Sequence, residues 1–127
     1  MKKAKAIAAL AKQLDASAAP MSLVGLYCQT DRPDLTLRFL NDAHLNQTMA
    51  YLTACAIYAA LFDKSPEGLP IDSITDIRFW NNKDRDKDRD GNPITKTFSD
   101  KDRAELQQIA WKGYQKFKQL RDGKAAD

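Results

Sequence analysis

The chain is poor in the residues that carry most metal, redox and acid–base chemistry, with two cysteines and one histidine among 127 residues. Cys28 and Cys55 lie far apart and neither belongs to a CxxC pair. This spacing excludes a disulfide framework and a zinc motif and predicts two buried free thiols. No segment approaches the roughly 20 apolar residues that span a bilayer. His44 is the one side chain suited to general acid–base work near neutral pH.

The chain also lacks a strong excess of either charge. Its 20 basic and 17 acidic residues are intermixed and give a net charge of +3. A nucleic-acid footprint needs Lys and Arg clustered on one face, so we expect no nucleic-acid partner. The N-terminal residues resemble a secretion signal in their basic start, but Lys5 and Lys12 interrupt the apolar stretch. We therefore expect a cytoplasmic protein with no membrane partner.

Helical periodicity occurs in three segments, which predict helices at 3–15, 46–62 and 100–121. The first has an apolar stripe made of Ala4, Ile7, Ala8, Ala11 and Leu14. The second has apolar residues on every side, so it must be covered all round by the domain or by a second subunit. The third begins after Ser99, a typical N-cap residue.

Between these helices, residues 21–27 form an apolar run of strand length, and residues 81–97 form a polar loop. Periodicity does not separate strand from helix over so few residues, so at most one short strand is expected. The length suits one domain covering residues 1–127. The predicted fold is mainly α, a small helical domain.

An aspartate ladder in the polar loop resembles the start of a calcium-binding loop. Asp86, Asp88 and Asp90 occupy positions one, three and five, and Gly91 follows at position six. Position twelve is Thr97, where a bidentate Glu is required, and three cations interleave with the aspartates. A solvated loop, weak divalent binding and a specific calcium site all remain open.

Several segments of the sequence resemble the C-terminal block of the SGNH/GDSL-type hydrolases. They include "RPDL" (32–35), "NDAH" (41–44), "TACAIYAALFDKSPEGL" (53–69) and "DGNPITKTFSDKDRAELQQIAWKGYQKFK" (90–118). The resemblance covers most of this chain and the last third to half of a family member. The part of the family with the nucleophile serine and the oxyanion blocks has no counterpart here.

The resemblance implies that His44 is the catalytic histidine. Asn41 stands at the position of the family's acidic partner, and Asp42 follows one residue later. The family fold is a three-layer α/β sandwich, so a chain without its sheet must have repacked as helices or buried the exposed face in a homodimer.

Two functions follow from these observations. The first is a hydrolase of small esters or phosphoesters that uses water as nucleophile, with His44 as general base or metal ligand and Asp42 orienting it. A divalent metal is the cofactor considered for it, held by His44 and carboxylates such as Asp86, Asp88 and Asp90. The alternative is a non-catalytic helical module for dimerisation or interaction.

Overall fold

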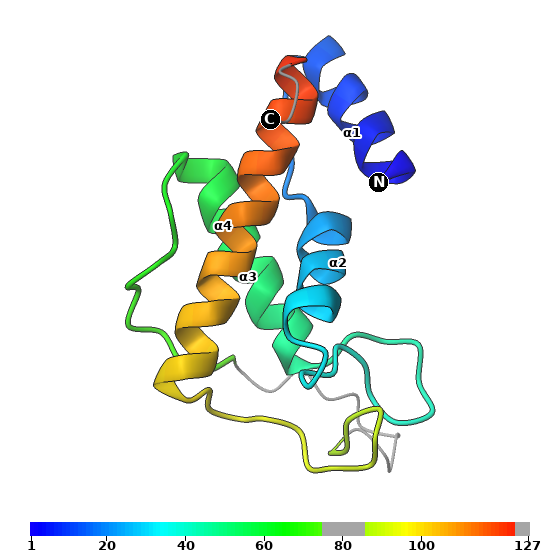
Figure 1. The fold of residues 1–127 in the computed structure, drawn as a ribbon, viewed down its shortest axis with the longest axis vertical. Coiled ribbons are helices and arrows are strands. Elements are labelled where there is room, and N and C mark those ends of the chain that lie inside the picture. Colours follow the sequence, from blue (N-terminus) through cyan, green and yellow to red (C-terminus); the bar gives the residue numbers. More distant parts are fainter. Residues whose placement is uncertain (75–85, 124–127) are drawn as a thin grey trace.

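The structure, a computed structural model, describes residues 1–74 and 86–123 and is built from α-helices (Figure 1). The helices are α1 (Lys2–Gln13), α2 (Met21–Asp31), α3 (Gln47–Phe62) and α4 (Asp100–Asp122). In the described ranges, β pairing is limited to isolated bridges. The prediction of a mainly α fold is confirmed. Residues 81–85 of the predicted polar loop lie outside the described residues.

The long helix α4 is the centre of the fold, because each of the other three helices packs against it (Figure 1). Helices α2 and α3 also contact each other, whereas α1 packs mainly on the C-terminal half of α4. The short loops of residues 32–46 and 86–99 gather at the opposite end of the molecule from α1. That end carries the candidate site.

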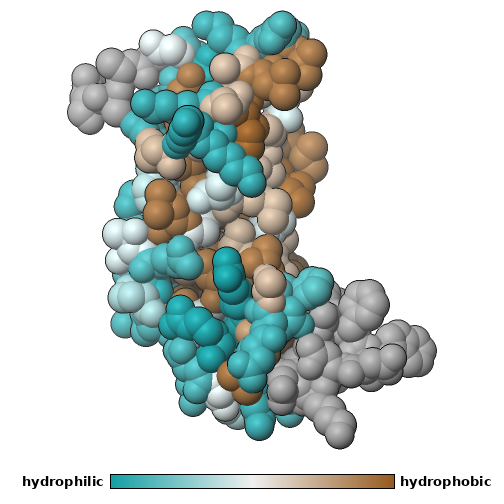
Figure 2. Space-filling view, turned by 90° about the vertical axis from the view of Figure 1, so that its right-hand side faces the viewer, coloured by the Kyte–Doolittle hydropathy of each residue, from teal (hydrophilic) through white to brown (hydrophobic). Residues whose placement is uncertain are grey.

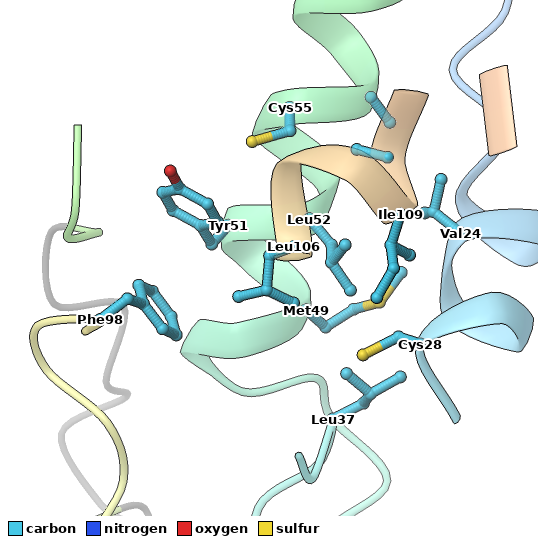
Figure 3. Close-up of a cluster of buried hydrophobic side chains, with 12 residues drawn as sticks. Val24, Cys28, Leu37, Met49, Tyr51, Leu52, Cys55, Phe98, Leu106 and Ile109 are labelled. Carbon is cyan, nitrogen blue, oxygen red and sulfur yellow. The ribbon is translucent and has the colours of Figure 1, made fainter. Parts of the chain in front are cut away.

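The main core lies where α2, α3 and α4 meet (Figure 3). Each of these helices contributes a completely buried side chain: Val24 from α2, Leu52 from α3 and Leu106 from α4. Cys28 and Cys55 lie in the same cluster, and both are free thiols, as predicted. Burial raises the pKa of each thiol to about 11, so neither is a ready nucleophile at neutral pH.

Side-chain caps set the starts of the two longest helices. Asn46 accepts hydrogen bonds from the backbone N–H groups of Thr48 and Met49 at the start of α3. Ser99 accepts one from the N–H of Asp102 at the start of α4, as its sequence predicts. These caps satisfy donors that have no partner within the helix.

The possible strand at 21–27 does not form, since these residues are the first part of α2. An isolated strand leaves its backbone groups unpaired, whereas a helix satisfies them within the segment. Leu23, Val24 and Cys28 then share one buried side. The helix ends at Asp31 because Pro33 disfavours the helical conformation for the residue before it, and Arg32 adopts φ −135°.

The predicted apolar stripe of α1 is only partly buried. Ala4, Ala8 and Ala11 are buried in a cluster with Phe117 of α4. Ile7 and Leu14 are exposed. The small alanine side chains let α1 approach α4 closely. The larger apolar side chains then point away from the core. None of the helices in the described ranges is long and apolar enough to cross a membrane.

Candidate functional site

His44 lies on a short hairpin-like turn between α2 and α3. Arg38 and Leu45 form an antiparallel bridge, and the N–H of Phe39 donates to the carbonyl of His44 at 3.3 Å. Asn41 adopts φ +49° within the turn, a left-handed conformation that asparagine tolerates better than most residues. The turn therefore has a defined backbone rather than that of an open loop.

Asp42 and His44 contact each other inside this turn. Oδ1 of Asp42 lies 2.5 Å from Nδ1 of His44 and also accepts the backbone N–H of His44 at 2.8 Å. The side chain of His44 is 71% exposed, whereas that of Asp42 is 11% exposed. A carboxylate at Nδ1 favours the tautomer in which Nε2 is the proton acceptor. The structure thus brings two of the three predicted residues together and leaves Asn41 to shape the turn.

Asn46 joins this turn to the start of α3. Its Nδ2 donates to the backbone carbonyls of Thr36 at 2.8 Å and Arg38 at 3.2 Å, while its Oδ1 caps the helix. The side chain is buried, so both the nitrogen and the oxygen of the amide form their hydrogen bonds inside the protein. An asparagine shortly before an apolar run is an N-cap signal, which indicates the cap but not the contact with the turn.

Asp88 supports the turn from behind. Its Oδ2 accepts the hydroxyl of Thr36 at 3.1 Å, and its Oδ1 accepts the N–H groups of Asp90 at 3.0 Å and Asn92 at 2.8 Å. Asp88 also forms a backbone bridge with Phe39. Asp88, the middle residue of the aspartate ladder, therefore holds the segment that carries His44 in place.

The predicted divalent-metal ligands do not converge. No three His, Cys, Asp or Glu side chains within residues 1–74 and 86–123 are grouped so that they could hold a metal ion. The carboxylate of Asp88 is engaged in the turn, and Asp90 pairs with Arg89 at 2.9 Å. That hydrogen bond lowers the pKa of Asp90. Asp86, Asp88, Asp90 and His44 are thus not grouped to hold a divalent cation.

A second polar cluster is structural. Arg32 follows α2 and hydrogen-bonds to Asp34 at 2.6 Å, to Asp102 at 2.7 Å and to Glu105. The hydrogen bond to Asp34 raises the pKa of Arg32 most, so the guanidinium stays charged. The cluster ties the end of α2 to the first turns of α4.

Comparison with known proteins finds no match: no family model, no curated protein and no solved structure is similar to this chain at a significant level. The resemblance to the SGNH/GDSL-type hydrolases stays a prediction. The function is therefore argued from the residues of the site.

Proposed function

We propose that this chain carries the acid–base part of a hydrolase that acts on activated esters or phosphoesters. His44 is the general base and Asp42 is the carboxylate that orients it. The observation that supports this role is the 2.5 Å contact between Asp42 Oδ1 and His44 Nδ1, next to an imidazole that substrate and water can reach.

Water is the nucleophile in this proposal, because the side chain of His44 is 71% exposed and water reaches its imidazole. Nε2 of His44 accepts a proton from water as the water oxygen attacks the carbonyl carbon or phosphorus. The bond to the leaving group then breaks, and the imidazolium returns the proton to the departing oxygen. Asp42 keeps the proton on Nδ1 and stabilises the imidazolium while it exists.

The open position of His44 limits the reaction to substrates with good leaving groups. Water surrounds an exposed site and screens its charges, so little electrostatic stabilisation of the transition state is expected there. General-base catalysis by itself contributes about 10²–10⁴-fold. An aryl ester suits such a site better than an unactivated amide or alkyl ester.

The test compares aryl ester and aryl phosphoester hydrolysis by the wild type and three variants of the turn. His44→Gln should abolish turnover above background, and Asp42→Asn should reduce it at least tenfold. Asn41→Gly, which keeps the left-handed backbone, should leave it unchanged. Chelator should have no effect. Equal rates for the wild type and His44→Gln would refute the proposal.

We also propose, as the alternative, a non-catalytic interaction module that uses the outer C-terminal part of α3. Ile57, Leu61 and Phe62 are exposed there, and Leu61 is 71% exposed. Tyr58 packs against Phe62 with tilted rings, 5.0 Å between ring centroids, and extends the apolar surface. Exposed apolar groups in contact with one another are typical of association surfaces.

A homodimer is the simplest partner for that surface. Light scattering should find a dimer for the wild type and a monomer for Leu61→Glu, with the helical circular dichroism signal retained. Leu10→Glu is the matched control, because Leu10 is also exposed but lies on α1. A wild-type monomer over the micromolar range would eliminate the homodimer.

A further inference from the structure

A shallow groove lined by both apolar and polar groups runs between α1, α2 and the turn that carries His44. It consists of two adjoining depressions of about 230 and 330 Å³, which share Met21 and Ser22. Small-ligand sites span about 300–1,000 Å³, so the groove has the size of a site for a small molecule. Its residues come from α1, α2, the turn and the start of α3, together with Phe117 of α4.

Large apolar side chains line this groove while remaining open to solvent. The exposed ones are Met1, Ile7, Met21, Leu26 and Leu45, each between 38% and 52% exposed. Figure 2 views the molecule from the side of α1 and α2, where hydrophobic residues reach the surface between hydrophilic ones. All three methionines of the chain line one of the two depressions. Methionine adapts its shape to apolar ligands more readily than branched residues do.

Gly25 keeps the floor of the groove open. A Cβ at this position would meet Met49 at 3.6 Å and Leu37 at 3.9 Å, which are ordinary contacts. Gly113 differs, because its Cβ would lie 2.5 Å from Val24. In a helix interior, alanine is favoured over glycine by about 0.5–1 kcal/mol. The packing of the fold therefore does not require Gly25, whereas a molecule lying over α2 benefits from the space it leaves.

The charged residues at the rim of the groove are all basic. Lys3 and Arg38 line it, and neither depression includes an aspartate or glutamate among its lining residues. The other arginines of the described ranges, Arg32, Arg89, Arg103 and Arg121, each pair with a carboxylate. No such ion pair is formed by Arg38 within those ranges, so its guanidinium is available to an anion.

We propose that this groove binds an aliphatic carboxylate of the fatty-acid class. The alkyl chain lies along Leu26, Met21 and Ile7 and displaces water from their side chains. The carboxylate pairs with the guanidinium of Arg38. Binding does not require His44 to act as a base, so this proposal and the hydrolase stand or fall separately.

Calorimetric titration of the intact chain with dodecanoate below its micellar concentration tests the proposal. Dodecanoate should bind, dodecyltrimethylammonium should not, and Arg38→Gln should weaken binding of dodecanoate about tenfold. Gly25→Ala should weaken it while raising the thermal midpoint, a combination that a purely structural glycine would not produce. His44→Gln and Leu61→Ser should bind as the wild type does.

Each of the following results would overturn the proposal. They are no heat of binding with dodecanoate, equal binding of the anionic and cationic amphiphiles, and unchanged affinity in both Arg38→Gln and Gly25→Ala. If either variant folds poorly by circular dichroism, the other decides. Loss of dodecanoate binding in His44→Gln would also contradict it, because it would place the carboxylate at the histidine instead.

Discussion

The buried side-chain amide of Gln107 offers the sharpest test of the packing between α3 and α4. Its Nε2 donates to the hydroxyl of Tyr51 at 3.0 Å and to the carbonyl of Leu69 at 2.9 Å. Its Oε1 accepts the N–H of Gly68 at 3.0 Å. The side chain is 1% exposed, so one amide holds the loop after α3 against both helices.

Gln107→Leu preserves the volume of this side chain approximately and removes all three hydrogen bonds. A buried polar group left without a partner costs about 1–3 kcal/mol. Gly68 is exposed and Leu69 is half-buried, so water replaces part of the loss. We therefore expect a decrease in the free energy of unfolding of about 2–3 kcal/mol. At about 4 °C per kcal/mol, the thermal midpoint should fall by roughly 8–12 °C.

The neighbouring residue supplies a matched control for this substitution. Gln108 is exposed on the same turn of α4, so Gln108→Leu should change the free energy of unfolding by less than about 0.5 kcal/mol. Urea unfolding followed by circular dichroism measures both variants. If they were equally stable, Gln107 would not anchor the loop and the reasoning would be refuted.

Three further changes test other contacts. Gly113→Ala should destabilise the protein by about 1–3 kcal/mol, since the new Cβ would lie 2.5 Å from Val24, and adding Val24→Ala should recover part of the loss in urea unfolding. Asn46→Ala should cost about 1–2 kcal/mol in the same assay, whereas Asn46→Ser keeps a cap and should cost less. The hydrogen bond from the Lys118 ammonium lowers the pKa of Asp63. The pair therefore stabilises the fold fully at pH values above the ordinary pKa of an aspartate. This stabilisation is lost as the pH falls through the lowered pKa. Thermal midpoints should therefore fall less between pH 5 and pH 2 in Asp63→Asn than in the wild type.

The helices that sequence predicts well are those with long, unbroken patterns. Residues 46–62 contain no breaker, and Ser99 marks the start of the last helix. The run at 21–27 is too short to show a period, and its conformation depends on whether a neighbouring strand exists to pair with it. Because none is available in the described ranges, the run adopts the helical conformation that satisfies its own backbone.

The residues of the candidate site also differ in how far the sequence reveals their contacts. Asp42 and His44 are two residues apart, so the sequence already brings them within reach of each other. Asp88 lies more than 40 residues further along the chain, and its pattern suggested a cation site. Only the fold shows that its carboxylate accepts hydrogen bonds from Thr36 and from its own turn.

The sequence by itself determined the helical class, the buried thiols and the cap of α4, because these depend on local periodicity and on side chains that bond to nearby backbone groups. The tertiary structure alone decided which face of α1 is buried, how Gln107 is satisfied and where the groove over Gly25 lies. Those features depend on the distance between segments remote in sequence, which a local pattern does not encode.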